Sequence, residues 1–348
     1  MTQLSCPALE RPEGAPVRSL CAANGGGSAL VVEGGAMRGI FACGVLDVFH
    51  EHAFQPFDVA IGCSVGACML ASHLAGQRGR NLRVFMQYMT RREFIDGRRF
   101  VRGGDWVDFD WLWHAIERDL PIDRAALAAS PVQLVLSATS YRTGEPVYLE
   151  PVDHDLMSAF KSSCALPILC RDPVHVGEQR LMDGSIAAPI PVQEAYRRGA
   201  RRILVIRSRP ATFVARASAV GRQPLYRHSP QLQRFHDSWD EAAWLWASAL
   251  AFHASPPFAR AMRAAHTTYR EAVEFIESPP TDCEILHIAP PAPLATGRTT
   301  QDARRLRRDY ALGREAGIRA LHAWNQQAER TRAAAIQNGD ACLAQARR

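Results

Sequence analysis

Several features that would place this chain in a familiar class are scarce or missing from its 348 residues. The nine cysteines are scattered, odd in number and never spaced Cys-x-x-Cys, which argues against a disulfide framework or a cysteine-ligated zinc site and favours a reducing compartment. No uninterrupted apolar run reaches the roughly 18 residues of a transmembrane helix. The N-terminal sequence lacks the basic start and apolar segment of a secretory signal. We therefore expect a cytoplasmic protein, with peripheral contact at the inner membrane face left open.

Lysine is nearly absent, since Lys161 is the only one and almost all of the 41 basic residues are arginines. They outnumber 35 acidic residues and give a net charge of +6, which is compatible with nucleic acid or an anionic membrane surface but requires neither. Hydrophobic residues make up 47% of the chain, enough for a sizeable core, which excludes a mostly disordered, collagen-like or fibrous protein. The length suits two domains or one large α/β domain.

Two strand–turn–helix units open the patterned part of the chain. The apolar runs 28–33 and 57–61 predict buried strands. Glycines follow each run, and apolar residues at helical spacing then predict helices over 36–53 and 65–76. Residues 1–27 are rich in Pro, Gly and Ala without periodicity, so we expect a flexible leader there.

The rest of the chain continues the alternation of strands and helices. Further strands are expected at 132–137, 147–149, 174–176, 179–182, 202–206 and 284–289. Helices are expected over 81–130, 156–161, 234–277 and from the Pro-rich 290–293 to the end, with a polar loop at 208–233. This alternation predicts an α/β protein with a mainly parallel sheet and helices on both faces.

The pentapeptide Gly62-Cys63-Ser64-Val65-Gly66 has the pattern G-x-S-x-G and stands between a predicted strand and a predicted helix. A nucleophilic serine in this setting occupies a tight turn, where a Cβ at either glycine would crowd the backbone. The start of the helix also favours a developing negative charge. The alternative is a serine N-cap flanked by packing glycines, with Cys63 as a small packed residue.

A second glycine-rich turn between a strand and a helix consists of Gly34, Gly35, Ala36, Met37, Arg38 and Gly39. Its backbone N–H groups could bind an oxyanion or a phosphate. The alternative is a turn that only starts a helix. A dinucleotide fingerprint would need glycine at position 36, which argues against a nucleotide-binding fold.

The third candidate is Asp183-Gly184-Ser185, just after a predicted strand. Such Asp-Gly pairs are most often simple turns. A serine hydrolase nevertheless needs a base, and none of the twelve histidines has an obviously catalytic setting. An aspartate at a strand end could serve if its surroundings raise its pKa.

These motifs, with the segment Ser162-Ser-Cys-Ala-Leu-Pro167, resemble the ordered sequence blocks of patatin-like phospholipases over about residues 28–207. The sequence over 279–320 resembles the YjjU-like bacterial branch of that family. The resemblance implies a three-layer α/β/α patatin-like fold. It also implies a catalytic core at 28–207 and a mostly helical C-terminal extension at 208–348 packed on the core.

The resemblance further implies a catalytic dyad in which Ser64 is the nucleophile and Asp183 the general base. Backbone amides in the loop 34–39, above all those of Gly35 and Ala36, would form the oxyanion hole. The implied substrates are phospholipids or lysophospholipids, with no metal, organic cofactor or nucleic acid. The sequence departs from the family pattern twice: Ala36 replaces a glycine, which matters only if φ must be positive there, and Ser185 adds a hydroxyl that could lower the basicity of Asp183.

Alternatives remain open at this point. A Ser-His-Asp esterase or thioesterase could use His287 or His322 as its base, and a catalytically weak lipid-binding or scaffolding protein could keep the fold. Arg38 suits a phosphate headgroup and a structural ion pair equally. The aromatic stretch 235–258 is expected to be core rather than a lid, and the Arg-rich 298–319 a solvated helix face rather than a lipid contact.

Overall fold

The computed structural model describes residues 26–151, 155–167, 170, 172–213 and 255–346, with side chains described to Glu329 apart from Ala328. Nearly all of the expected leader and of the aromatic stretch 235–258 lie outside these residues, as does most of the expected loop 208–233. Within the described helices, none combines the length and the apolar character that a membrane span requires.

The centre of the fold is a mixed sheet with the strand order β5-β6-β3-β2-β1-β7-β8, in which β4 also pairs with β3. Its strands are β1 (Gly27–Val32), β2 (Val59–Cys63), β3 (Gln133–Ser140), β4 (Pro146–Leu149), β5 (Val174–Val176), β6 (Gln179–Asp183), β7 (Ala200–Ile206) and β8 (Glu284–Ile288). The pairings along β3-β2-β1-β7-β8 are parallel, and β4, β5 and β6 add antiparallel pairings at one edge. The predicted α/β fold with a mainly parallel sheet is confirmed.

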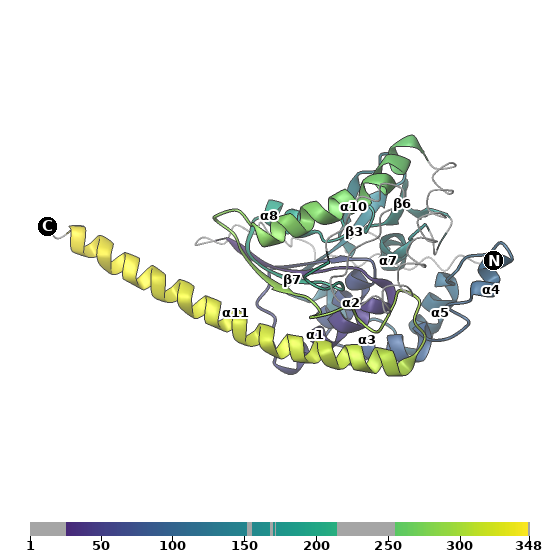
Figure 1. The fold of residues 1–348 in the computed structure, drawn as a ribbon, viewed down its shortest axis with the longest axis horizontal. Coiled ribbons are helices and arrows are strands. Elements are labelled where there is room, and N and C mark those ends of the chain that lie inside the picture. The colour runs from purple at the N-terminus through teal and green to yellow at the C-terminus, as the bar shows by residue number, and fades with distance from the viewer. Residues whose placement is uncertain (1–25, 152–154, 168–169, 171, 214–254, 347–348) are drawn as a thin grey trace.

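Helices cover both faces of the sheet (Figure 1). They are the 3₁₀ turn η1 (Ala36–Gly39), α1 (Ile40–Glu51), α2 (Val65–Leu74), α3 (Arg80–Val84), the π-helical η2 (Phe85–Met89), α4 (Gly97–Val101), α5 (Phe109–Asp119), α6 (Arg124–Ala128), α7 (Leu156–Cys164), α8 (Val192–Arg197), α10 (Pro256–Glu277) and α11 (Ala303–Ala346). The sequence analysis missed α8, because six residues are too short for a helical period to emerge.

The two faces of β1 belong to two different cores, because successive side chains of a strand point to opposite sides. Leu30 and Val32 pack with the apolar residues of α1, α2 and α11. Ala29 and Val31 pack on the other side with those of α8 and α10. A strand buried on both faces reads as a continuous apolar run, which is why the run was recognised from sequence.

The strand β2 begins and ends two residues later than predicted. Its start is delayed because the Asp58 carboxylate accepts hydrogen bonds from the Ser28 amide and hydroxyl, both 2.8 Å long, and holds the chain in a bend. Its end extends through Gly62 and Cys63, which pair with Leu136 and Ser137 of β3 rather than forming the predicted turn. The turn is therefore confined to the residue that follows Cys63.

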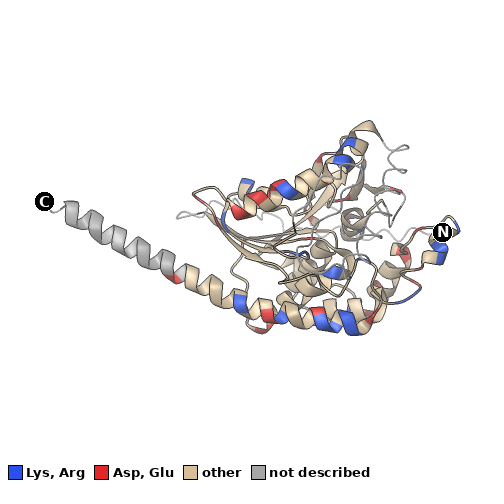
Figure 2. Cartoon of the chain, viewed as in Figure 1, with Lys and Arg blue, Asp and Glu red and all other residues tan. Residues whose placement is uncertain are grey.

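The long helix α11 packs its first half along α1, and its second half projects from the body of the molecule (Figure 1). Gly44 of α1 lies against the Tyr310 carbonyl, and Gly313 of α11 against the Phe41 carbonyl, so a Cβ at either glycine would clash. The Tyr310 hydroxyl donates to Asp47 over 2.8 Å. Arg304, Arg305, Arg307 and Arg308 at the start of α11 are exposed. Figure 2 shows basic residues in blue along this part of the helix.

The strand β8 lies in the segment 208–348 that the sequence predicts as a C-terminal extension. It pairs with β7 in parallel register over five residues, from Glu284 to Ile288, so the central sheet continues into that segment. The proposed division into a core at 28–207 and an extension after it stays a prediction.

Candidate active site

Ser64 and Asp183 meet because β2 and β6 pair with the same side of β3 and their C-terminal ends meet there. The register Cys63↔Ser137 brings the C-terminal end of β2 to the middle of β3. The strand β6 runs the opposite way, and its last residue, Asp183, pairs with the next residue of β3, Ala138. The other side of these β3 residues is occupied by β4, so β2 and β6 share one side and converge end to end. The topology thereby closes a sequence separation of 119 residues between Ser64 and Asp183.

Ser64 occupies a strained turn between β2 and α2. Its backbone angles are φ 54° and ψ −131°, a region that non-glycine residues rarely adopt. A Cβ at Gly62 would clash with the Ala67 backbone, and one at Gly66 would lie 2.6 Å from the Val32 carbonyl oxygen. The two flanking glycines therefore permit the turn, as the pentapeptide predicts.

The C-terminal end of α7 fixes the position of Ser64. The Ser163 hydroxyl accepts a hydrogen bond of 2.9 Å from the Ser64 amide and donates one of 2.7 Å to the Ser137 carbonyl on β3. The Cys164 thiol also lies within hydrogen-bonding contact of the Ser64 side chain. The block Ser162–Pro167, which had no individual role in the sequence analysis, thus ties the nucleophile candidate to the sheet.

Asp183 is only 2% exposed, and its backbone is tied to neighbouring segments. Its amide donates to the Ala165 carbonyl over 3.0 Å, and its carbonyl accepts from the Thr139 hydroxyl over 2.8 Å. The Ser185 amide donates to Oδ1 of Asp183 over 2.7 Å, and the side chains of Ser185 and Ser64 lie near enough to the carboxylate to lower its pKa.

Burial raises the pKa of Asp183 above its usual value. Hydrogen bonds from Ser185 and Ser64 and the positive charge of Arg298 lower this pKa in turn, without cancelling the effect of burial. A carboxylate with a raised pKa is a stronger base than an ordinary aspartate, which suits proton abstraction from a hydroxyl. The structure therefore places a nucleophile candidate beside a base candidate.

The glycine-rich loop lies directly against the elbow. A Cβ at Gly34 would be 2.9 Å from the Ser64 Cβ, so only glycine allows this approach. The Gly34 carbonyl accepts a 2.8 Å hydrogen bond from the hydroxyl of Ser208, which follows β7. The Ser208 amide donates over 2.7 Å to the buried Glu33 carboxylate, so β1 and the segment after β7 hold the loop together.

The backbone amides of the loop differ in what they bind. The Met37 amide donates to the Arg298 carbonyl over 3.3 Å, and the Arg38 amide donates to the Gly35 carbonyl over 3.1 Å. The amides of Gly35 and Ala36 have no acceptor among the described residues. Ala36 has a φ of 49°, the strained condition under which the sequence analysis expected an alanine to matter here.

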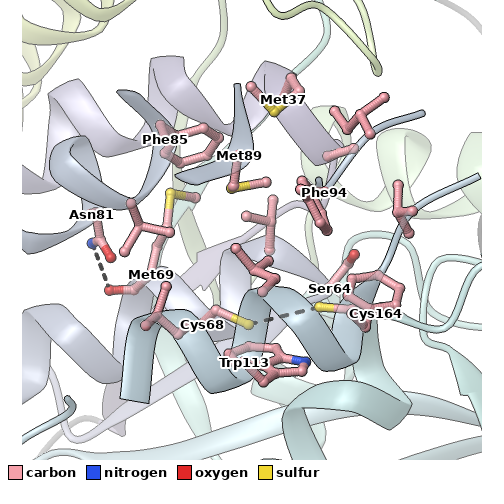
Figure 3. Close-up of a pocket in the computed structure, with 18 of the residues that line it drawn as sticks. Met37, Ser64, Cys68, Met69, Asn81, Phe85, Met89, Phe94, Trp113 and Cys164 are labelled. Atoms are coloured by element: carbon pink, nitrogen blue, oxygen red, sulfur yellow. Dashed lines mark hydrogen bonds between the residues drawn. The ribbon is translucent and has the colours of Figure 1, made fainter. Parts of the chain in front are cut away.

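A mainly apolar cavity opens beside Ser64 and encloses about 820 Å³, open solvent at its mouth included. In Figure 3 the labelled Ser64 and Asn81 lie at opposite ends of this cavity, with Met69, Phe85 and Met89 along its walls. Most of the lining residues belong to α2, α3, η2 and α5, and Ala36 and Arg298 also line the cavity. Neither Arg38 nor any described histidine lines the cavity.

The two histidines considered as alternative bases lie elsewhere. His287 shares a row of the sheet with Ile61, three strands away, or on the order of 14 Å at about 4.8 Å per strand. Burial and the neighbouring Arg207 lower the pKa of His287 to about 4. His322 is exposed on α11. Among the described residues, no group of three or more His, Cys, Asp or Glu side chains is arranged to hold a metal ion.

Sequence reasoning therefore identified the three turns that meet at the cavity but missed the residues that hold them together. Ser163 lies within the segment Ser162–Pro167, whose family resemblance was the one sequence signal that could have pointed to it. Ser208 and Arg298 follow a strand in loops whose sequences carry no recognisable pattern. Their importance depends on contacts with segments 90 or more residues away in the chain.

Comparisons with known proteins match two segments of the chain. A family model described as patatin-like phospholipase matches residues 30–196, and one described as a domain of unknown function (DUF6363) matches residues 255–329. The Escherichia coli K12 protein described as "Uncharacterized protein YjjU" is 35% identical over 292 residues, which cover 83% of this chain and 75% of that protein. The crystal structure of VipD from Legionella pneumophila has a TM-score of 0.39 and 12% identity, covering 85% of this chain and 67% of that one.

Proposed function

This chain belongs to the patatin-like phospholipase family, and we propose that it hydrolyses acyl esters of lipids with Ser64 as nucleophile and Asp183 as general base. The observation that carries the proposal is the approach of the Ser64 side chain to the buried Asp183 carboxylate, close enough to lower the pKa of that carboxylate, while Ser64 itself lines an apolar cavity. A nucleophile within hydrogen-bond reach of its base is the basic requirement of covalent acyl transfer.

In the acylation step, Asp183 accepts the Ser64 proton while Oγ attacks the ester carbonyl carbon. The carbonyl oxygen becomes an oxyanion, and the Gly35 and Ala36 amides stabilise it as hydrogen-bond donors. When the tetrahedral intermediate collapses, the C–O bond to the alcohol breaks and protonated Asp183 returns its proton to the leaving oxygen. The product is an ester between Ser64 and the acyl chain.

Deacylation reverses these roles with water as the nucleophile. Asp183 removes a proton from the water while its oxygen attacks the acyl-enzyme carbonyl, and the same amides stabilise the second oxyanion. The bond to Ser64 Oγ then breaks, the serine recovers its proton from Asp183, and the free carboxylic acid leaves.

The cavity supports a lipid as the substrate. Its walls are mainly apolar, including Leu112, Trp113 and Ile116 of α5 and Phe85 of η2, as is usual where a protein binds an apolar ligand. An acyl chain in this cavity would present its carbonyl carbon to Ser64 at the cavity edge. We therefore propose phospholipids or lysophospholipids as the substrate class.

The positions of the histidines support a dyad over a triad. His287 lies three strands from β2, and its lowered pKa leaves it a weak base. His322 is exposed on α11. Substitution of either residue by glutamine should leave hydrolysis close to the wild-type rate, whereas a triad enzyme would lose most of it.

The proposal is tested by assaying the full chain against phospholipids, lysophospholipids and short-chain esters. Ser64→Ala should abolish turnover, and Asp183→Asn should lower it by about 10²–10⁴-fold, the usual contribution of general base catalysis. Ser158→Ala is the matched control, because the Ser158 hydroxyl bonds only to Asp155 in the described structure. Wild-type turnover by Ser64→Ala would refute the proposal.

A fluorophosphonate probe separates an enzyme from a protein that only binds lipid. We expect the probe to label wild type and the Ser158→Ala control, and not to label Ser64→Ala. A folded wild-type protein that binds lipid vesicles but takes up no probe would instead support a binding or scaffolding role.

A further inference from the structure

The loop formed by residues 295–301, which connects β8 to α11, reaches from the second matched segment of the chain into the candidate active site. Arg298 and Thr299 line the same cavity as Ser64 and Ala36. The loop belongs to the residues matched by the domain of unknown function rather than by the phospholipase model. The role proposed for this loop rests on the proposed dyad of Ser64 and Asp183.

The start of the 295–301 loop is fixed by α11. Asp309 is fully buried, and its carboxylate accepts hydrogen bonds from the amides of Ala295, over 3.3 Å, and Thr296, over 2.7 Å. The Gly297 amide donates over 2.8 Å to the hydroxyl of Thr300, which closes a tight bend around Arg298. A buried carboxylate bound by two backbone amides holds its loop in one conformation.

The end of the loop is fixed by the wall of the cavity. The Gln301 side-chain amide, Nε2, lies within hydrogen-bonding distance of three backbone carbonyls, those of Thr90 at 3.1 Å, Arg91 at 3.1 Å and Ile95 at 3.3 Å. Ile95 itself lines the cavity. The loop is therefore attached at both ends, and Arg298 stands in the middle between the attachments.

Arg298 acts on both halves of the candidate catalytic machinery. Its carbonyl accepts the 3.3 Å hydrogen bond from the Met37 amide, the residue directly after Ala36 in the glycine-rich loop. Its guanidinium is close enough for the positive charge to act on the Asp183 carboxylate. Arg298 is thus hydrogen-bonded to the oxyanion loop through its backbone, and its charge acts on the pKa of Asp183.

We propose that Arg298 is a positioning residue for ester hydrolysis, which orients the oxyanion loop through its carbonyl and brings a positive charge to the cavity that Ser64 lines. The segment matched by the domain of unknown function thereby supplies part of the active site. Without the 295–301 loop, the Met37 amide loses its acceptor and the turn at Ala36 loses one of its supports.

The serine and cysteine side chains near Asp183 are uncharged at neutral pH, so they do not cancel the effect of the Arg298 charge. Ser64 and Ser185 are neutral hydrogen-bond donors, and burial raises the pKa of the thiols of Cys63 and Cys164, which keeps both protonated. Removal of the Arg298 charge should therefore raise the pKa of Asp183. In the pH dependence of kcat/KM, the acidic limb reports this group because only the carboxylate can accept the Ser64 proton.

The experiment compares pH profiles of kcat/KM for Arg298→Gln, Arg298→Lys and the control Arg304→Gln, which removes the same charge from the exposed start of α11. We expect the acidic limb of Arg298→Gln to move to higher pH by up to about one unit, the lower end of the effect of a nearby opposite charge. Arg298→Lys should keep most of the wild-type limb. Arg304→Gln should match wild type.

The backbone part of the proposal has its own variant. Gln301→Ala removes the three carbonyl contacts without touching the 34–39 loop, and we expect it to lower kcat more than it raises KM, because a displaced oxyanion loop weakens binding of the transition state rather than of the substrate. A rise in KM alone would contradict a role in positioning the oxyanion loop.

The outcomes also separate this inference from the proposed dyad. If Asp183→Asn is inactive but Arg298→Gln keeps the wild-type limb, or if Arg304→Gln shifts the limb equally, the dyad stands and the role of the Arg298 charge is refuted, while Gln301→Ala decides the role of its backbone. If Asp183→Asn remains fully active, the dyad itself fails, whatever Arg298 does.

Discussion

The strained backbone at Ser64 yields a prediction about stability that does not depend on substrate. Ser64 has φ 54° and ψ −131°, so any residue with a Cβ is strained at this position. Ser64→Gly should relieve the strain, and Ser64→Ala should not. Both variants lack the hydroxyl that donates to Asp183, so the difference between them isolates the cost of the Cβ.

The expected magnitude follows from two opposing terms. A non-glycine residue held in such a conformation costs of order 1–3 kcal/mol. Glycine gains more freedom in the unfolded chain than alanine, which offsets about 0.4–1 kcal/mol of that relief. Ser64→Gly should therefore be more stable than Ser64→Ala by about 0.5–2 kcal/mol in the free energy of unfolding.

The assay is equilibrium unfolding in urea or guanidinium, followed by tryptophan fluorescence and circular dichroism, with the slope m compared between variants. Ala53→Gly is the matched control. Ala53 has φ 48° in an exposed position after α1, where glycine commonly ends a helix. It should gain stability of similar sign and keep the hydrolytic activity that both Ser64 variants lose.

If Ser64→Gly proves no more stable than Ser64→Ala while Ala53→Gly gains stability, the backbone at Ser64 is not strained and the elbow geometry is wrong. If all three variants change m, the differences in stability reflect the unfolded state instead of the folded one. Thermal unfolding at fixed pH then decides whether the folded or the unfolded state is affected.

Three further predictions concern the same region and the packing of α11. Burial raises the pKa of Asp183 in the folded state, so the wild type loses stability relative to Asp183→Asn as the pH rises from the ordinary carboxyl range through that raised pKa. The variant should therefore be the more stable protein at pH 8, and the difference in unfolding free energy should close near pH 3. A difference that stays constant across unfolding measurements at several pH values would contradict this. Ala36→Gly should keep activity and match or exceed the wild-type stability, since φ is 49° at that position, whereas Ala36→Val should lose both, and equal stability of the two variants would argue against the strained turn. Gly313→Ala should destabilise the protein by about 1–3 kcal/mol, because the new methyl group clashes with the Phe41 carbonyl between α1 and α11; denaturation of this variant beside Gly317→Ala, whose Cβ would meet Val48 at 3.1 Å, measures how much of that cost arises from the closer contact.

The strands and the glycine turns were predictable because their signals are local. Buried parallel strands such as β1 and β7 read as apolar runs, and the elbow at Ser64 requires glycine on both sides. The end of β2 was misplaced by two residues because strand pairing with β3, rather than any property of Gly62 and Cys63 themselves, decides where β2 stops.

The meeting of Ser64 and Asp183 was not predictable from local pattern, and only the family resemblance indicated it. It depends on β6 pairing antiparallel with the C-terminal end of β3, on the same side of β3 where β2 pairs with the preceding residues. The paired residues of β3 and β6 are more than 40 positions apart in the chain. Turn and strand signals around Asp183 are the same for an ordinary Asp-Gly turn. The support for its proposed catalytic role lies only in the burial and hydrogen bonds that the pairing creates.

The contacts around the site also explain why the chain needs its C-terminal segment next to an active site built mainly from residues 30–196. Two of the described residues with strained backbones, Ala36 and Ser64, line the same cavity, and Asp183 is buried at a cost. Such features persist only where neighbouring structure holds them. Part of that support comes from Ser208, which follows β7, and from Arg298, which follows β8. The strands β7 and β8 are themselves paired along five residues. A site that stores strain in its first two turns therefore depends on the sheet edge and on the loop that α11 secures through Asp309.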